Sequence, residues 1–147
     1  MCRILLENIT LDGRSVDILI DESCISSIVS HGSDSYHGEN LEKVDCTGKA
    51  AMPGFVNMHT HAGMAMMRGV GEDIVFHEWL DRIWRLESGI TEDYVYHATK
   101  EACVEMIKTG TTTFNDHYWH HPMAYRAAQE MGLRSVLSYV ICDKNDP

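Results

Sequence analysis

The sequence lacks the features that mark secreted and membrane-spanning proteins. No apolar run approaches the ~20 residues that cross a bilayer. The N-terminus, MCRILLENITLDG, has no basic region, apolar core or small-residue cleavage site of a signal peptide. The five cysteines are scattered and form no CxxC pair, which favours a reducing compartment over a disulfide framework. We therefore expect a cytoplasmic protein with no membrane partner.

Positive charge is also scarce. The chain has 12 Lys and Arg against 22 Asp and Glu, a net charge of −10. Because nonspecific binding to nucleic acids depends on clustered Lys and Arg, this balance argues against a nucleic-acid partner. The 147 residues are enough for a hydrophobic core. They are too few for a complete (β/α)₈ barrel, which needs roughly 200 residues or more.

The first 53 residues predict a small β module. RILLENIT is followed by Asp12-Gly13, a strong turn signal, and SVDILID then alternates apolar and polar residues. CISSIVS is expected to form a third strand, with Ile25 and Ile28 facing inward. HGSDSYHGEN is rich in Gly, Ser, Asp and Asn, which predicts a loop.

From residue 54 the pattern changes to alternating strands and helices. Residues 55–60, TTTFND and RSVLSYVICD predict strands. VFHEWLDRIWRLES has apolar residues at helical spacing. Thr91 is expected to cap a second helix that Gly110 ends, and PMAYRAAQEM predicts a third. The order β, α, α, β, α, β indicates an α/β fold of parallel strands with crossover helices.

The segment with the most chemical content is PGFVNMHTHAGMAMMRG, residues 53–69. Alternate residues of a strand share a face, so His59 and His61 should project together with Asn57, while Val56 and Met58 should face covering helices. Two imidazoles at the C-terminal end of a parallel strand are half of a typical metal site. The pair alone is equally compatible with ordinary histidines, because nine His in 147 residues give an expected count of about 0.5 such pairs by chance.

Three separated blocks carry a family resemblance: AAMPGFVNMHTHAGMAMMRG, EWLDRIWRLE and TGTTTFNDHY. Together they resemble the metal-dependent amidohydrolase superfamily, in particular its deaminase and chlorohydrolase branch, and within it the methylthioadenosine/S-adenosylhomocysteine deaminases. The resemblance implies the N-terminal part of a (β/α)₈ barrel preceded by a small β-sandwich module. Residues 1–53 would form the module and residues 54–147 the first βα units of an incomplete barrel.

The resemblance also implies a site. His59 and His61 would bind a catalytic divalent metal, with zinc expected and iron as the alternative. Such an ion lowers the pKa of bound water toward about 7, which makes hydroxide available for attack on the carbon that carries an amino group. Trp79 would line the substrate pocket and Glu87 would bind ribose hydroxyls. A helix-core tryptophan and a solvated carboxylate are the open alternatives for these two residues.

Three further residues are expected to support the site. Asn57 shares the metal strand, Arg68 would anchor the loop that follows it, and Asp116 would orient a loop or the metal ligands. His117, His120 and His121 are interpreted as ordinary loop histidines, because the family takes its remaining ligands from later strands.

The third histidine, the acid/base residues and the final aspartate of the family are expected beyond residue 147. No catalytic acid or base is therefore assigned within this chain. We interpret the chain as the N-terminal portion of a larger enzyme, and we expect the 147-residue portion to be inactive alone.

The leading functional hypothesis is a metal-dependent hydrolase of C–N bonds that deaminates an adenine nucleoside derivative. Two alternatives remain open. One is a related amidohydrolase acting on guanine, cytosine or a chlorotriazine, and the other is a non-catalytic fragment that needs a partner chain. The expected partner is a small-molecule substrate, either a nucleoside or a heteroaromatic amine, and a homo-oligomer is also possible.

Overall fold

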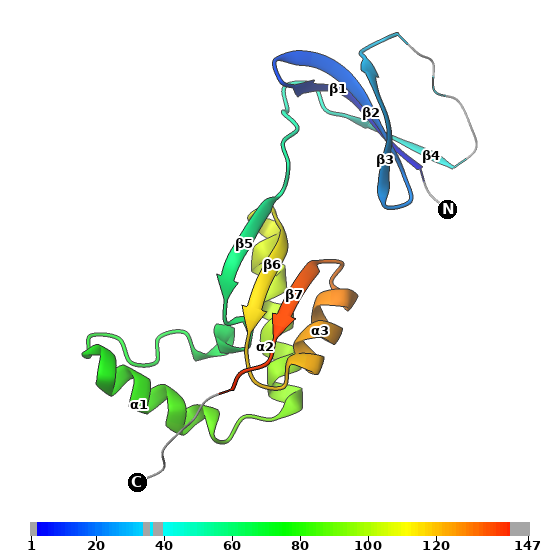
Figure 1. Ribbon diagram of the computed structural model, residues 1–147. Helices are drawn as coiled ribbons and strands as arrows, with labels where there is room; N and C mark the ends of the chain where they lie inside the picture. Colours follow the sequence, from blue (N-terminus) through cyan, green and yellow to red (C-terminus); the bar gives the residue numbers. More distant parts are fainter. Residues whose placement is uncertain (1–2, 34–35, 37–39, 142–147) are drawn as a thin grey trace. The chain divides into compact units, whose positions relative to one another are not determined.

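The computed structural model describes residues 3–33, 36 and 40–141. The chain divides into two compact units, Met1–Pro53 and Gly54–Pro147, and each is described by itself (Figure 1). Among the helices of the described residues, none is both long enough and apolar enough to cross a membrane. Cys24, Cys46 and Cys103 carry free thiols, whereas Cys2 and Cys142 lie outside the described residues.

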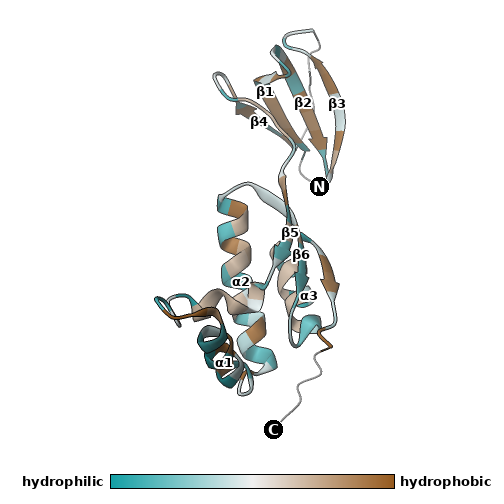
Figure 2. Cartoon of the chain, turned by 60° about the vertical axis from the view of Figure 1, so that its left-hand side comes forward, coloured by the Kyte–Doolittle hydropathy of each residue, from teal (hydrophilic) through white to brown (hydrophobic). Residues whose placement is uncertain are grey.

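The first unit is a four-stranded sheet. Its strands are β1 (Arg3–Leu11), β2 (Arg14–Asp21), β3 (Cys24–Ser30) and β4 (Leu41–Asp45), arranged in the order β3-β2-β1-β4. β1 and β3 run antiparallel to β2, and β4 runs parallel to β1. Hydrophobic residues extend along much of β1, β2 and β3 (Figure 2). One buried cluster of the unit contains Ile9, Val16, Ile18 and Cys46, and Leu5 and Leu19 are buried as well.

The predicted turn and the third strand are confirmed. Asp12 and Gly13 have φ angles of +48° and +76°, as a tight hairpin turn requires. The predicted inward orientation of Ile25 and Ile28 is wrong, because their exposed fractions are 63% and 47%. Both residues lie on β3, an edge strand of this sheet, where one neighbouring strand is absent and burial is less complete.

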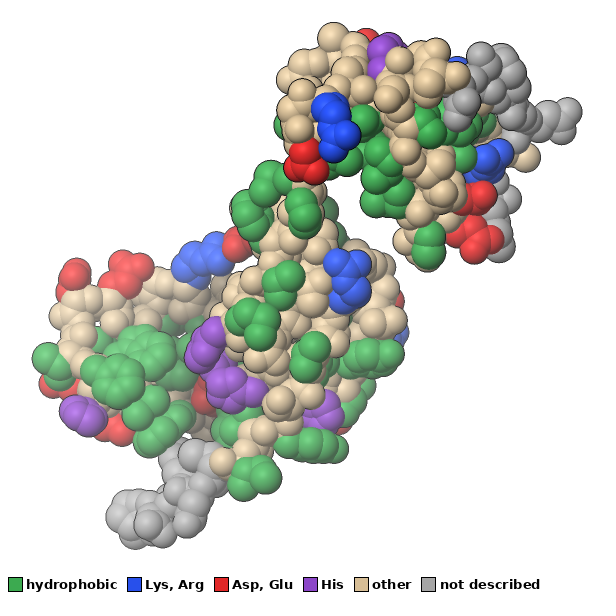
Figure 3. Space-filling model, turned by 45° about the horizontal axis from the view of Figure 1, so that its top comes forward, with side chains coloured by type: hydrophobic (Ala, Val, Ile, Leu, Met, Phe, Trp, Pro, Cys, Tyr) green, Lys and Arg blue, Asp and Glu red, His purple; other side chains and the backbone are tan. Residues whose placement is uncertain are grey.

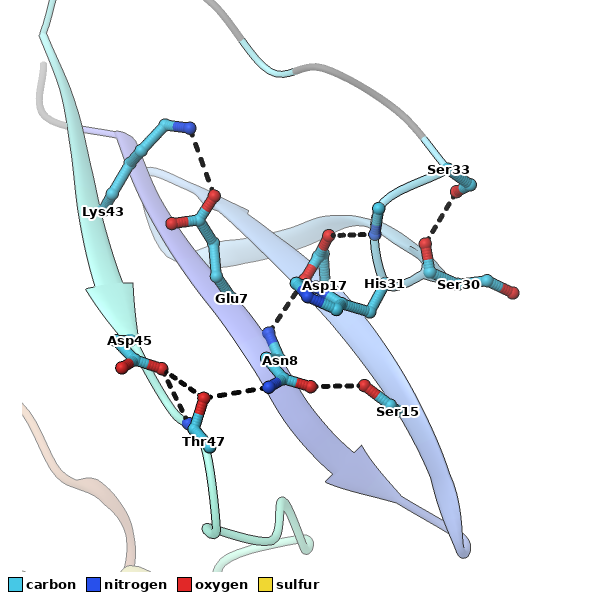
Figure 4. A network of polar contacts seen from close by, with 11 residues as sticks. Glu7, Asn8, Ser15, Asp17, Ser30, His31, Ser33, Lys43, Asp45 and Thr47 are labelled. Carbon is cyan, nitrogen blue, oxygen red and sulfur yellow. Dashed lines mark hydrogen bonds and ion pairs between the residues drawn. The ribbon is translucent and has the colours of Figure 1, made fainter.

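A buried aspartate organises the polar contacts of the first unit (Figure 4). Asp17 accepts hydrogen bonds from the backbone N–H of Asn8 at 2.9 Å, from Nδ1 of His31 at 2.7 Å and from the backbone N–H of Gly32 at 3.2 Å. Asn8 lies at an irregularity in the β1–β2 pairing and has a φ of +57°. Burial by itself raises the pKa of Asp17, but these hydrogen bonds outweigh it and hold the pKa below its usual value.

Asp17→Asn is expected to lower the free energy of unfolding of the first unit by about 2 kcal/mol at neutral pH. The amide of asparagine cannot accept from both Asn8 and Gly32, so one N–H would face another N–H. Because the folded pKa lies below the unfolded one, the carboxylate stabilises the fold above the unfolded pKa of about 3.9. This contribution is lost as the pH falls through the lowered folded pKa.

Hydrogen exchange of the β1 and β2 amides measures this effect in the first unit alone. Asp12→Asn, in the exposed hairpin turn, removes the same charge without touching the network and should change stability by less than about 0.5 kcal/mol. Equal protection in Asp17→Asn and wild type at neutral pH would contradict the role assigned to Asp17.

The second unit contains a three-stranded parallel sheet with helices. In chain order it consists of β5 (Phe55–Thr60), η1 (Ala62–Met67), α1 (Phe76–Glu87), α2 (Glu92–Lys108), β6 (Thr111–His117), α3 (His121–Glu130) and β7 (Arg134–Ser138). The strand order is β5-β6-β7, and both pairs are parallel. The predicted sequence of elements is therefore confirmed.

The helix ends follow the local sequence. The hydroxyl of Thr91 accepts the backbone N–H of Tyr94 at 3.2 Å, which caps α2 as predicted. Gly110, at a φ of +83°, follows the end of α2, as only glycine does readily. β7 is shorter than the predicted strand because its pairing with β6 ends at His117 and Ser138.

Helices α2 and α3 pack against each other and cover one face of the sheet. The core between them contains Cys103 and Met106 of α2, Phe114 of β6 and Ala128 of α3. Burial raises the pKa of the Cys103 thiol to about 11, so this cysteine is an unreactive core residue.

The opposite face of the sheet is open in the described residues. Val56 and Met58 are 55% and 68% exposed, so the prediction that they face covering helices is wrong. They line a shallow hollow together with residues of β6 and β7, including Thr113, Asn115 and Val136.

Candidate active site

The two histidines of the HxH motif meet at the C-terminal end of β5. Nε2 of His59 lies 3.2 Å from Nε2 of His61. Nδ1 of His61 lies 3.1 Å from the backbone oxygen of His117, at the end of β6. Since a carbonyl only accepts, Nδ1 of His61 carries the proton, and in the neutral ring Nε2 bears the lone pair.

The spacing of the two Nε2 atoms fits a shared metal ion. Zinc binds imidazole nitrogen at about 2.0–2.1 Å, which in a tetrahedral shell places two nitrogens about 3.3 Å apart. A hydrogen bond from the other ring nitrogen to a carbonyl is the usual support of a metal-binding histidine. Within residues 3–33, 36 and 40–141 no group of three His, Cys, Asp or Glu is placed to hold an ion.

An irregularity in β5 changes which residues share a face. Asn57 pairs with Phe114 and Thr60 pairs with Asp116, so three steps along β5 match two along β6. Paired residues share a face, and Phe114 faces the helical core. The prediction that Asn57 lies on the face of the two histidines is therefore wrong. Its side-chain oxygen instead accepts the backbone N–H of His59 at 3.2 Å, inside the irregular segment.

Asp116 is a β6 residue that pairs with Thr60 of the histidine strand. It is 2% exposed, and its Oδ1 accepts the backbone N–H of Ala62 at 3.2 Å. Burial raises the pKa of Asp116, although the Ala62 hydrogen bond and the neighbouring His61 and His117 act in the opposite direction. The contact links the end of β6 to the turn that follows His61.

Arg68 forms an ion pair at the end of the same turn. Its two terminal nitrogens donate to the two carboxylate oxygens of Glu105 on α2, at 2.7 and 2.9 Å. The hydrogen bonds from Arg68 hold the pKa of Glu105 below its usual value. Both side chains are well exposed, so the pair ties the loop to α2 from outside the site and adds little stability.

A hollow of about 410 Å³ adjoins His61. Pockets of this size accept small organic molecules. Trp79 contributes to its wall and stacks on Phe76, with ring centroids 5.9 Å apart. Figure 3 shows apolar and histidine side chains on this unit. The lining is mostly aromatic and aliphatic, with two imidazoles and one carboxylate: His61, Met64, Phe76, Trp79, Leu80, Ile83, Trp84, Glu87, His117, Tyr118, Trp119 and Val140.

Glu87 is the carboxylate of this hollow. It is the last residue of α1, is half-buried, and accepts a hydrogen bond from Nε1 of Trp119 at 3.1 Å. Burial and the nearby Glu87 charge raise the pKa of both Tyr94 and Tyr118 above the usual value. The carboxylate is therefore surrounded by groups that keep their protons at neutral pH.

The sequence interpretation missed the part that the β6–α3 segment plays. His117 is the last residue of β6, and its ring centroid lies 4.5 Å from that of His61. Tyr118 and Trp119 follow and reach Glu87 and the hollow. The sequence did contain a signal for this segment, namely its position directly after a predicted strand. The C-terminal ends of neighbouring parallel strands meet at one edge of a sheet. His120 and His121 start α3, with His121 against the ring of Tyr139.

Comparison with known proteins identifies the family. Residues 50–146 match the amidohydrolase family. The chain belongs to this family. The family assignment made from the sequence is thereby confirmed.

Relatives of this amidohydrolase are deaminases named for adenine nucleosides. The 5'-deoxyadenosine deaminase of Methanoregula boonei is 43% identical over 97% of this chain and 33% of its own length. The 5'-deoxyadenosine deaminase of Methanospirillum hungatei is 47% identical over 92% of this chain and 30% of its own length. A 5-methylthioadenosine/S-adenosylhomocysteine deaminase of Archaeoglobus fulgidus is 43% identical over 71% of this chain and 25% of its own length. The chain thus spans about a third or less of these relatives.

Solved amidohydrolase structures share the fold. An atrazine chlorohydrolase from Arthrobacter aurescens, complexed with zinc, gives a TM-score of 0.78 at 21% identity, covering 96% of this chain and 38% of that one. Guanine deaminase from C. acetobutylicum gives 0.66 at 20% identity, covering 99% of this chain and 36% of that one. The predicted fold class, the N-terminal part of an amidohydrolase, is confirmed by these matches.

Proposed function

We propose that this chain supplies the first two metal ligands and part of the substrate pocket of a hydrolytic deaminase that acts on an adenine nucleoside derivative. The observation that carries the proposal is the convergence of two Nε2 atoms, 3.2 Å apart, beside a hollow that contains one carboxylate. The curated relatives, named for 5'-deoxyadenosine, methylthioadenosine and S-adenosylhomocysteine, support this substrate class.

His59 and His61 would hold the ion, with zinc as the expected metal. When bound, such an ion makes hydroxide available from water at neutral pH. The backbone oxygen of His117 keeps the proton of His61 on Nδ1, so that Nε2 remains a lone-pair donor. Asp116 holds the turn after His61 through Ala62. These contacts fix the direction of the His61 ring before any ligand binds.

The hollow would bind the rest of the substrate. Trp79 offers an aromatic surface to a planar base. Glu87 offers carboxylate oxygens that accept hydrogen bonds, which suits the paired hydroxyls of a ribose. The mostly apolar lining would lower the local dielectric around a bound substrate and so strengthen both kinds of contact.

The test is ammonia release by the complete protein that contains this chain, purified with zinc or iron. We expect turnover of 5'-deoxyadenosine, methylthioadenosine or S-adenosylhomocysteine. Guanine, cytosine and a chlorotriazine are the comparison substrates. Turnover confined to one of these would contradict the nucleoside assignment, and no turnover of any compound would contradict a hydrolase. The 147-residue chain alone is expected to release no ammonia.

A further inference from the structure

A hydrogen bond connects the end of α1 to the segment after β6. Nε1 of Trp119 donates to Oε2 of Glu87 at 3.1 Å, across 32 residues of sequence. An indole N–H is a donor only, and its acceptor here is a charged oxygen, which makes the hydrogen bond stronger than a neutral one. The contact therefore fixes one carboxylate oxygen and leaves Oε1 available to a ligand.

Glu87 lies where its side chain would otherwise be mobile. It is the last residue of α1, and Ser88 and Gly89 follow it directly. A glutamate side chain at a helix end has several accessible rotamers. Trp119 is half-buried beside it. The hydrogen bond from its indole N–H limits the number of rotamers that the Glu87 side chain adopts.

Two hollows share the same pair of residues. Glu87 and Trp119 line the 410 Å³ hollow that contains His61, and they also line a second hollow of about 510 Å³ with Ser88, Ile90 and His120. The pair therefore stands between the two spaces. Without the indole donor, the carboxylate is free to turn from the first hollow toward the second.

We propose that Trp119 is a positioning residue that holds the Glu87 carboxylate toward the substrate hollow and thereby selects ribonucleosides over deoxyribonucleosides. The inference rests on the proposed deaminase function. Buried Tyr118, the residue before Trp119, lines the same hollow. A carboxylate held in one direction presents Oε1 to the ribose hydroxyls in one orientation, whereas a mobile one discriminates less between sugars.

The test compares 5'-deoxyadenosine with 2',5'-dideoxyadenosine in the complete protein. Trp119→Phe removes the donor and keeps an aromatic ring. We expect it to reduce the ratio of kcat/KM for 5'-deoxyadenosine to kcat/KM for 2',5'-dideoxyadenosine about tenfold, mainly through a higher KM for 5'-deoxyadenosine. Because the ratio is internal to each variant, partial unfolding affects both substrates equally. Tyr96→Phe removes another aromatic donor, the one that Tyr96 directs to Glu130 on the α2–α3 surface, and should leave the ratio unchanged.

A double substitution isolates the contact. In a Glu87→Gln background, Trp119→Phe should cause little further change in the ratio, because the partner of the indole is already altered. An independent readout is the indole N–H spectrum of ¹⁵N-tryptophan-labelled wild type and Glu87→Gln, in which one resonance should move.

The outcomes separate the two proposals. An unchanged ratio in Trp119→Phe, or unmoved indole resonances in Glu87→Gln, would overturn the role of Trp119 while leaving the deaminase assignment intact. No ammonia release from either nucleoside by the wild type would instead contradict the proposed function.

Discussion

Replacing His59 or His61 with alanine in the complete protein is expected to remove most of the tightly bound metal and to lower kcat/KM at least about a thousandfold. The two Nε2 atoms lie 3.2 Å apart, so each substitution deletes one ligand of the same ion. In His59→Ala, the His61 ring still supplies one nitrogen only, because its Nδ1 is bound to the carbonyl of His117. Metal content by elemental analysis and steady-state kinetics on 5'-deoxyadenosine measure the two effects.

The matched control is His97→Ala. His97 is an exposed histidine on α2, remote in sequence from the HxH motif, that approaches Asp93 at 3.5 Å and the ring of Tyr96 at 5.0 Å between centroids. Its substitution should leave both metal content and kcat/KM within a factor of about two. Wild-type metal content in both His59→Ala and His61→Ala would contradict the assignment of these residues as ligands.

Replacing Gly63 with alanine is expected to destabilise the second unit by about 3 kcal/mol. A Cβ at this position would lie 2.2 and 2.3 Å from two ring carbons of Tyr118. The ring is 4% exposed and packs with Val95 and Ala124, so it has little room to move. Because Gly63 follows His61 by two residues, we also expect weaker metal binding in the complete protein.

Tryptophan fluorescence during urea unfolding measures this change in the second unit, because all three tryptophans lie within it. Gly89→Ala is the control. Its added Cβ would meet only a backbone oxygen at 3.8 Å, an ordinary contact distance, and should change stability by less than about 0.5 kcal/mol. Unfolding of Gly63→Ala at the same urea concentration as wild type would contradict this prediction, because it would show that the Tyr118 ring moves away from the added Cβ at no cost in stability.

The order of elements could be predicted because it depends on local patterns. Apolar spacing predicts α1, β-branched residues predict β6, and Thr91 and Gly110 mark the ends of α2. The histidine pair was also recognisable, since alternate residues near a strand end project together. Each of these signals lies within a few neighbouring residues.

The details that depend on packing between distant segments could not be predicted. The extra residue in β5 that separates Asn57 from the histidine face depends on pairing with β6, some 57 residues away. The Trp119–Glu87 hydrogen bond joins segments 32 residues apart. The burial of Ile25 was predicted wrongly, because the apolar pattern of one strand does not indicate whether that strand lies at a sheet edge.

The central claim is that His59 and His61 bind one catalytic ion, and anomalous diffraction at the zinc edge from crystals of the zinc-loaded complete protein tests it most directly. The account predicts one peak at about 2.0–2.1 Å from Nε2 of both histidines. A zinc peak that contacts neither residue, or no peak with the two Nε2 atoms still 3.2 Å apart, would contradict it.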